Sequence, residues 1–474
     1  MPLSRRQLLH RGAAGAGFVA VGDLAGLLSI AVPTAGATPP RSILPAGPYG
    51  ALVPDPDGLL DLPEGFAYTV VSEAGKPTAD GGVIPDRFDG TGLFTNDVGN
   101  SILVRNSEQA ELAGLEFPAT AAPEYTYDPQ AGGGTTTVEV DATGGVVDEY
   151  VSLAGTVRNC AGGVTPWGTW LTGEETEDAA GEFLVRDHGF VFEVDPIDVH
   201  NNVNPTPLEA LGRFSHEAVA VDPRDGMVYL TEDAGEPFGL LYRATPSTPL
   251  GGYGSLRDGA LLEALVATDE SEAIVPDLAV HTEVGTTLTL GWAEVPDPLA
   301  AETPTRFQFD AVTRSQKLEG AWWGNDAAYV VASFAREGDG APAGHDGQVW
   351  RLDPVAGTLE LVVRFPVNAH PDGDIFDGPD NITVAPWGGL ILCADGEGVQ
   401  HLYAVGADGS GHVFARNARD TTEFAGAVFS ADGTTLFVSM YSPGVTFAVT
   451  GPWDAAAVRG SSVPRTSAPA TSTR

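Results

Sequence analysis

Basic residues are scarce in this sequence. Lysine and arginine together number 24, against 64 aspartates and glutamates, and the formal net charge at pH 7 is −40. A surface of this charge repels DNA, RNA and anionic lipid, so we expect no nucleic-acid binding. An anionic ligand would need a site that is neutralised locally, as bound polyvalent cations would do.

A long hydrophobic run is also missing. The weakly apolar stretch at residues 12–32 is rich in Gly and Ala and is interrupted by Asp23, so we expect no membrane insertion. It follows the arginine pair at residues 5–6 and ends at the small residues 35–37. This order predicts that residues 1–37 are a twin-arginine signal, used by the twin-arginine translocase, and that the protein is periplasmic or extracellular.

Cysteine is nearly absent. Cys160 and Cys393 are the two in the chain. A disulfide is compatible with an exported protein, but nothing in the sequence places the two side chains close together. Cys393 lies in an apolar stretch and is expected in the core.

Helical periodicity is rare, whereas 60 glycines and 36 prolines punctuate the chain. Short alternating apolar runs recur beside turn signals, at residues 190–194, 227–230, 348–352, 389–393 and 435–439. This repetition predicts an all-β fold and favours a β-propeller, for which we expect six blades, over stacked sandwiches.

We expect one propeller domain over residues 38–458, with loop and helical insertions. Residues 256–298 are interpreted as such an insertion, with a helix-like piece at 256–268 followed by an acidic loop. Residues 459–474 are rich in Ser, Thr, Pro and Ala and are predicted to be disordered. A propeller buries most of its own edges, which indicates a monomer.

Several familiar catalytic motifs are missing: no Ser/His/Asp or Cys/His triad, no glycine-rich phosphate loop and no regular calcium loop is legible. Instead, unusual clusters lie at the ends of predicted strands. They are residues 158–175, with Cys160, Glu174 and Glu175; residues 213–218, with His216 and Glu217; residues 317–320; and residues 380–382, with the following Asp395.

Loops of successive blades converge on one mouth of a propeller, where carboxylates would repel one another unless cations bind. Carboxylate and Asn oxygens suit calcium, whereas the Cys160 thiolate suits iron, so the clusters hint at a mixed metal site. Taken singly, each cluster also has a simpler interpretation. Glu174-Glu175 fits a solvated loop, and His216 fits a structural histidine.

Together, these clusters, residues 423–426 and the ending at residues 442–453 resemble the PhoX family of secreted bacterial alkaline phosphatases, over roughly residues 54–453. The resemblance implies an exported β-propeller that hydrolyses small phosphate monoesters with Fe(III) and Ca²⁺. It implies that Cys160 binds iron, that Glu217 and Glu319 bridge iron and calcium, and that Asn159 lies beside the metals. The further metal ligands that it implies are Glu174, Glu175, Asp380, Asn381 and Asp395.

Two positions depart from the family pattern. Lys317 stands where the family has a phosphate-binding arginine, and lysine lacks the bidentate fork of arginine. We expect Lys317 and Asn159 to be catalytic residues, with Lys317 helping to hold the phosphate oxygens as charge develops. Ala394 stands where the family tends to have glutamate. Lys317 leaves room for a phosphodiesterase or lactonase on the same scaffold, and Ala394 leaves room for a non-catalytic calcium-binding propeller.

Overall fold

The computed structural model describes residues 47–78, 81–368, 375–407 and 409–453. The predicted export signal and the predicted disordered tail lie outside these residues. In the part of the chain that is described, no helix has the length and apolar character needed to cross a membrane.

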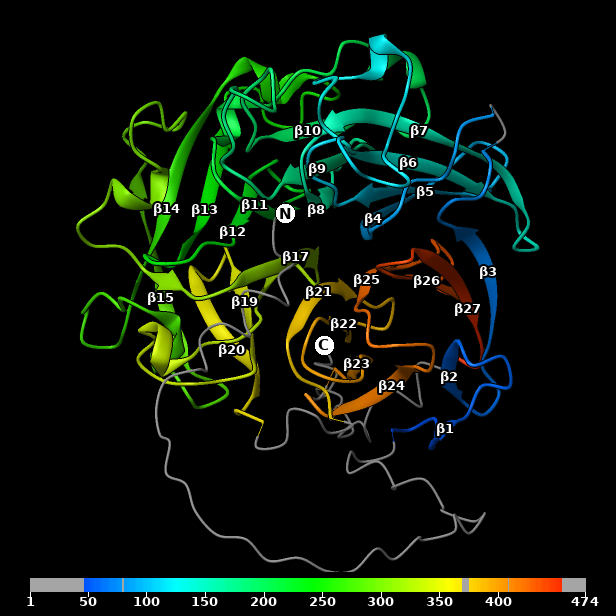
Figure 1. Ribbon diagram of the computed structural model, residues 1–474. Helices are drawn as coiled ribbons and strands as arrows, with labels where there is room; N and C mark the ends of the chain where they lie inside the picture. The colour runs from blue at the N-terminus through cyan, green and yellow to red at the C-terminus, as the bar shows by residue number, and fades with distance from the viewer. Residues whose placement is uncertain (1–46, 79–80, 369–374, 408, 454–474) are drawn as a thin grey trace, which may run out of the picture. The chain divides into compact units, whose positions relative to one another are not determined.

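The described strands form six blades arranged around a central channel (Figure 1). In sequence order, the first three blades are β4 (Phe88–Thr95), β5 (Ser101–Ser107), β6 (Gly133–Val140) and β7 (Val146–Thr156); β8 (Asn159–Val164), β9 (Trp170–Glu174) and β10 (Val191–Val194); and β11 (His216–Val221), β12 (Val228–Glu232), β13 (Gly239–Pro246) and β14 (Ala260–Thr268).

The other three blades are β17 (Leu318–Gly324), β18 (Ala327–Ala332), β19 (Gly347–Asp353) and β20 (Thr358–Phe365); β21 (Pro379–Val384), β22 (Leu390–Ala394), β23 (His401–Val405) and β24 (Gly411–Asn417); and β25 (Phe424–Phe429), β26 (Thr435–Met440), β27 (Val445–Thr450) and β3 (Ala67–Glu73). The inner strands β4, β8, β11, β17, β21 and β25 contact one another in this order, and β25 contacts β4. The ring is therefore closed, and the all-β propeller prediction is confirmed.

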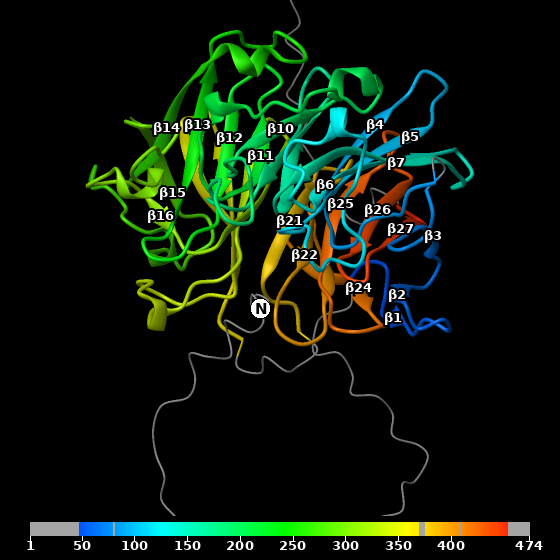
Figure 2. The same cartoon turned by 45° about the horizontal axis from the view of Figure 1, so that its top comes forward.

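Two segments from the beginning of the described chain complete blades from its end. Strand β3 pairs with β27, and the two lie side by side in Figure 2. Strand β2 (Leu60–Pro63) pairs with β24 and with β1 (Leu52–Val53). The fifth and sixth blades thus depend on strands that are distant from them in the sequence.

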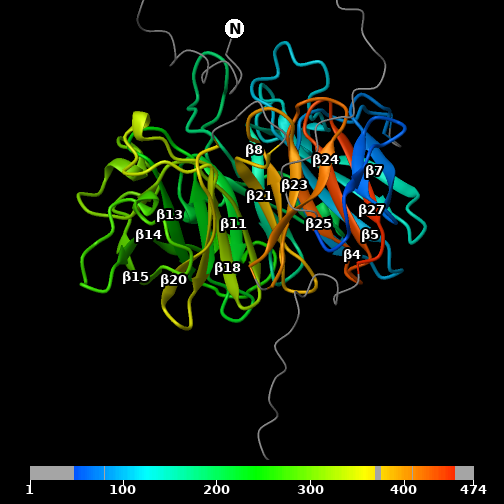
Figure 3. The ribbon, with the colours of Figure 1, turned by 90° about the horizontal axis from the view of Figure 1, so that it is seen from below.

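The remaining regular elements are short, apart from β15. This strand (Thr287–Glu294) joins β14 to β20 at the outer side of the third and fourth blades (Figure 3), and β16 (Arg314–Ser315) pairs with β13. The 3₁₀ helices are η1 (Pro123–Tyr125), η2 (Val199–Asn202), η3 (Glu209–Leu211), η4 (Ser255–Asp258), η5 (Leu278–Val280), η6 (Thr305–Phe307) and η7 (Glu337–Asp339).

The helix-like interpretation of residues 256–268 is wrong. Apart from the single turn η4, this segment is β14, the outermost strand of the third blade. Its apolar residues Leu262, Ala264 and Leu265 pack into the blade cores. An apolar run of this length does not by itself distinguish a buried strand from a helix, and pairing with β13 decides the outcome.

Glycines let the inner strands approach one another closely. A Cβ atom on Gly90 of β4 would lie 2.6 Å from the Ala161 Cα of β8, and one on Gly320 of β17 would lie 2.6 Å from the Asp380 carbonyl oxygen of β21. Neighbouring backbones therefore meet where a side chain would keep them apart. This close approach brings together the side chains that the inner strands carry at their beginnings.

Candidate metal centre

The six blades repeat one local pattern at the same end of the channel. In each blade the first residue of the inner strand pairs with the last residue of the second strand, and a register shift follows within the next few residues. The pattern defines three sets of equivalent residues: the entry position, just before the inner strand; the ligand position, its second residue; and the exit position, just after the second strand.

Five of the six ligand positions carry a metal-binding type of side chain. They are Asp89, Cys160, Glu217, Glu319 and Asp380, with Ala425 in the sixth blade. All five are buried. Because the inner strands contact one another around the ring, their ligand positions face a common space.

The exit positions add further acids. They are Glu108, Glu175, Asp233, Ser333, Asp395 and Tyr441, and the entry positions are Arg87, Arg158, Ser215, Lys317, Gly378 and Glu423. Backbone hydrogen bonds tie the two sets together. In five blades the exit N–H donates to the entry carbonyl, as from Glu108 to Arg87 and from Glu175 to Arg158.

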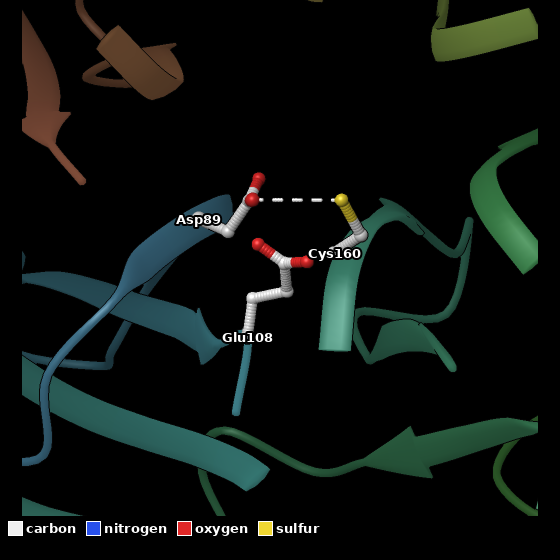
Figure 4. Close-up of side chains that lie close together, drawn as sticks. All are labelled: Asp89, Glu108 and Cys160. Atoms are coloured by element: carbon white, nitrogen blue, oxygen red, sulfur yellow. Dashed lines mark hydrogen bonds between the residues drawn. The ribbon is translucent and has the colours of Figure 1, made fainter. Parts of the chain in front are cut away.

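Nine of these side chains form one continuous cluster, which we call the acidic ring. It consists of four overlapping groups in which the candidate ligand atoms lie within 4.8 Å of one another: Asp89, Glu108 and Cys160; Cys160, Glu175 and Glu217; Glu217, Glu319 and Asp380; and Asp380, Asp395 and Glu423. Figure 4 shows the first group, in which the Cys160 thiol donates to Asp89 Oδ2 at 3.5 Å.

The electrostatics of the acidic ring favour cations. Burial, and then the negative charges of Asp89 and Glu217, raise the pKa of the Cys160 thiol well above its usual value. Burial, and then Asp395 and Asp380, likewise raise the pKa of Glu423. A bound cation reverses both effects, because it stabilises the ionised form of each ligand. The donor set of carboxylates and one thiolate therefore fits hard metal ions together with a metal that accepts sulfur.

The structure brings six of the predicted metal ligands into the acidic ring: Cys160, Glu175, Glu217, Glu319, Asp380 and Asp395. Glu174 lies apart from them. Its carboxylate accepts hydrogen bonds from the backbone N–H groups of Val157, Gly189 and Phe190 and lies 2.6 Å from His188 Nδ1. Side chains alternate along a strand, so only one residue of the Glu174-Glu175 pair faces the channel.

Both predicted asparagines make contacts that position their neighbours. The Asn381 side chain donates to Asp380 Oδ1 at 3.1 Å and accepts from the Gly426 N–H at 2.7 Å, which links two blades. The Asn159 side chain accepts from the Thr156 hydroxyl and donates to the Thr172 hydroxyl at 2.9 Å. These contacts fix the strand that carries Cys160.

Lys317 lies at the acidic ring, but carboxylates engage its ammonium. Its Nζ lies 2.5 Å from Glu319 Oε1 and 2.8 Å from Asp233 Oδ2. The residue sits at an entry position with a left-handed backbone, φ 51°. Its side chain thus spans from its own blade to the exit position of the preceding blade.

Two simpler interpretations are confirmed. The buried His216 ring lies against Phe214, its Nε2 is 3.1 Å from the Gly212 carbonyl oxygen, and burial lowers its pKa to about 3. Cys393 is a buried core residue, and neither Cys393 nor Cys160 forms a disulfide with a residue that the structure describes.

Sequence reasoning missed three members of the acidic ring: Asp89, Glu108 and Glu423. Asp89-Gly90 looks like an ordinary turn, and Glu108 has no distinctive neighbours. Superposing the starts of the recurrent strands would have found Asp89. In five of the six inner strands a Gly or Ala directly follows the ligand position, as in Asp89-Gly90 and Glu319-Gly320.

Comparison with protein families gives a match over nearly all of the described chain. The model of the family described as Alkaline phosphatase PhoX matches residues 47–149 and 143–444. The chain belongs to the PhoX alkaline phosphatase family. It is accordingly a metal-dependent phosphatase that hydrolyses phosphate monoesters, as the resemblance of its clusters implied, and the alternative hydrolase and binding-module interpretations are not favoured. No curated protein matches the sequence.

A solved structure of a PhoX protein agrees with the fold. PhoX of Pseudomonas fluorescens in complex with vanadate, a transition-state analogue, is similar with a TM-score of 0.64 and 18% identity, covering 83% of this chain and 96% of that one. A gluconolactonase of Xanthomonas campestris is similar with a TM-score of 0.42 and 13% identity, covering 86% of this chain and 99% of that one. At 18% identity the likeness to the Pseudomonas fluorescens structure is one of fold.

Proposed function

We propose that this PhoX family phosphatase works with iron and calcium ions held in the acidic ring. The supporting observation is the continuous series of nine ligand-type side chains that converge from all six blades, with one thiolate among carboxylates. Cys160, Glu175 and Glu217 would hold iron, since thiolate is the soft ligand of the set. Glu217, Glu319, Asp380, Asp395 and Glu423 would hold calcium through oxygen atoms.

Such ions supply Lewis-acid activation of water and of the phosphoryl group. The chain's own residues provide the frame. Asn381 fixes the rotamer of Asp380 through its hydrogen bond, and the backbone bonds between entry and exit positions hold Glu108 and Glu175 in place. Lys317 supplies a cation beside Glu319, where it limits the negative potential that a phosphate dianion would meet.

We further propose that residues 1–37 direct the chain to the twin-arginine translocase and that the mature enzyme acts as a monomer outside the cytoplasm. The support is the order of basic, apolar and small residues in the sequence and the closed ring of blades, which leaves few strand edges for association. Phosphate monoesters in the surroundings would be its substrates.

The deciding experiment measures hydrolysis of a chromogenic phosphate monoester at alkaline pH by the purified exported protein. Iron and calcium contents are determined by elemental analysis on the same sample. We expect turnover with calcium present, loss of turnover on chelation, and recovery when calcium is returned. Absence of turnover in a folded, iron-loaded protein would overturn the proposal.

A further inference from the structure

The entry positions carry three basic side chains. Arg87, Arg158 and Lys317 precede the inner strands of the first, second and fourth blades, and all three have left-handed backbones, with φ of 59°, 50° and 51°. Non-glycine residues seldom adopt this conformation. Its recurrence at equivalent positions gives the three side chains the same direction of departure from the backbone.

Lys317 shows where that direction leads. Its ammonium reaches the ligand position of its own blade, Glu319, and the exit position of the preceding blade, Asp233. Backbone hydrogen bonds place Arg158 and Arg87 at the same edge. The Arg158 carbonyl accepts from the Glu175 N–H and its own N–H donates to the Gln109 carbonyl, and the Arg87 carbonyl accepts from the Glu108 N–H. The three cations thus belong at the same edge of the acidic ring.

An electrostatic effect supports this placement of Arg87. Burial, Glu108 and Glu423 raise the pKa of the Tyr441 phenol, and the positive charge of Arg87 acts in the opposite direction. The positive charge of Arg87 thus acts on Tyr441, the exit position of the preceding blade. The same phenol donates to the Glu108 carbonyl oxygen, so it lies beside the acidic ring.

The two arginines differ from Lys317 in the contacts that their charged groups make. Two carboxylates engage Lys317, whereas neither guanidinium makes a hydrogen bond or an ion pair with a residue that the structure describes. Arg158 is exposed and Arg87 is half-buried. The chain has 64 acidic residues, yet these two arginines at the edge of the acidic ring have no carboxylate partner among the described residues. Their guanidinium groups are therefore available to bind an anionic ligand.

We propose that Arg87 and Arg158 bind the phosphoryl oxygens of the substrate at the mouth of the acidic ring. The inference rests on the proposed function and names the groups that orient its substrate. A planar guanidinium can hold two phosphate oxygens at once, which a lysine ammonium cannot do. The arginine fork that Lys317 lacks is thereby supplied from two equivalent positions in neighbouring blades.

The test compares the variants Arg158→Gln, Arg87→Gln and the double variant with Arg257→Gln. The control removes the same charge from the turn η4, next to the outermost strand of the third blade. Inorganic phosphate is the probe. Its inhibition constant and its calorimetric dissociation constant are measured beside the KM for the chromogenic ester, with iron and calcium contents and the melting temperature of each sample.

We expect each single variant to raise the KM and the phosphate constants together by about ten-fold, with metal contents unchanged. Arg257→Gln should leave all three constants at their wild-type values. Should an Arg→Gln variant fail to fold, Arg158→Lys and Arg87→Lys decide, because they keep the charge and lose the fork, and their phosphate constants should still rise.

Two outcomes would overturn the proposal. If the KM rises while the two phosphate constants do not change, the arginines contact the alcohol part of the ester and not its phosphoryl oxygens. Phosphate constants equal to those of the wild type in every variant would make both arginines solvated surface residues. Since calorimetry with phosphate needs no turnover, a wild type that binds phosphate but does not hydrolyse the ester would contradict the proposed function and not this inference.

Discussion

The adjacent residues Glu174 and Glu175 have different tasks, because only Glu175 belongs to the acidic ring. Glu174 accepts three backbone N–H groups and meets His188, which in turn lies 3.4 Å from Asp128. Although burial disfavours a charged imidazole, the contacts with Glu174 and Asp128 raise the pKa of His188. Glu175 lies on the channel side with Cys160 and Glu217.

We therefore expect Glu174→Gln and Glu175→Gln to fail in different ways. The first replaces a charged acceptor of several hydrogen bonds, and bonds to charged groups are worth about 1.5–3 kcal/mol, so the free energy of unfolding should fall by that order. The second should lower metal content, with little change in stability when it and the wild type are both freed of metal by chelation. Thermal unfolding and elemental analysis of both proteins separate the two roles, and metal loss in Glu174→Gln at unchanged stability would restore Glu174 as a ligand.

Replacement of Cys160 gives a second specific prediction at the residue scale. Cys160→Ser keeps the size of the side chain but removes the thiolate, so we expect iron and turnover to be lost together. Cys393→Ala is the matched control, because Cys393 is equally buried but lies in the core of the fifth and sixth blades. It should lower the unfolding free energy by about 1 kcal/mol while iron remains. Iron retention by Cys160→Ser would refute the thiolate assignment.

Membership of the acidic ring could be predicted only for residues that lie in a distinctive stretch of the sequence. Cys160 and Glu175 stand in a conspicuous run of the sequence, and because side chains alternate along a strand, one residue of the Glu174-Glu175 pair has to face away from the site. Glu423 could not be assigned, since its approach to Asp380 and Asp395 depends on contacts between blades. The partners of Lys317 lie 84 residues apart from it in one case, a distance that local patterns do not encode.

At the scale of the element, the inner strands determine the dimensions of the acidic ring. Gly320 faces the Asp380 carbonyl oxygen and the Asn381 Cα, which would lie 2.6 and 2.9 Å from an added Cβ. A methyl group there pushes β17 away from β21 and separates Glu319 from Asp380.

Gly320→Ala should accordingly reduce the unfolding free energy by about 1–3 kcal/mol and weaken calcium binding. Gly338→Ala is the control, because no atom lies within 4 Å of its added Cβ and the glycine needs no left-handed backbone. Calcium titrations and melting curves of both variants provide the measurement. Equal calcium affinities and melting temperatures of the two variants would mean that β17 and β21 can move apart without loss of the site.

The fourth blade contains a histidine that makes it sensitive to acid. His345 is fully buried just before β19, and its Nδ1 accepts from the Gly347 N–H at 3.1 Å. Burial, and then the charges of Arg364 and Arg336, lower its pKa to about 3. The folded protein favours the neutral form of His345. The contribution of His345 to the free energy of unfolding is therefore complete above the unfolded pKa of about 6.5 and is lost as the pH falls below that value.

Stability should therefore decline on acidification below about pH 6.5, with His345 contributing up to about 1.4 kcal/mol per pH unit. His345→Asn keeps an acceptor for Gly347 and removes the titrating group, so the decline should be shallower in this variant. Urea unfolding at several pH values between about 4 and 7 provides the comparison. Parallel pH profiles for the two proteins would exclude His345 as a contributor.

For the whole molecule, the strand and turn pattern was sufficient to predict an all-β propeller. The recurrent runs at residues 227–230, 348–352, 389–393 and 435–439 lie within or largely overlap β12, β19, β22 and β26. The pattern could not show that β3 completes the sixth blade or that β15 joins two blades. Both pairings are set by which edges meet after folding, and neither strand has a distinctive sequence.

A molecule with a formal charge of −40 and a mostly buried ring of acids should depend on cations for its stability. Ligands that bind only the folded state stabilise it by RT ln(1 + [L]/Kd), about 2.7 kcal/mol at a hundred-fold excess over Kd. We expect chelation to lower the melting temperature by several degrees and calcium to restore it, whereas sodium chloride of equal ionic strength should not. Calorimetry measures this, and recovery with sodium chloride alone would trace the effect to surface charge.

The closure of the sixth blade has a consequence for biosynthesis. Strand β3 (residues 67–73) cannot pair until its partner β27 (residues 445–450) has been synthesised. On the ribosome, the last blade therefore forms only near the end of translation. Contacts over such separations form slowly, and the waiting strand exposes an open edge. The proposed twin-arginine export, which would carry folded cargo, would let blade closure finish in the cytoplasm, and the proposed iron would then be enclosed in the compartment where the chain is made.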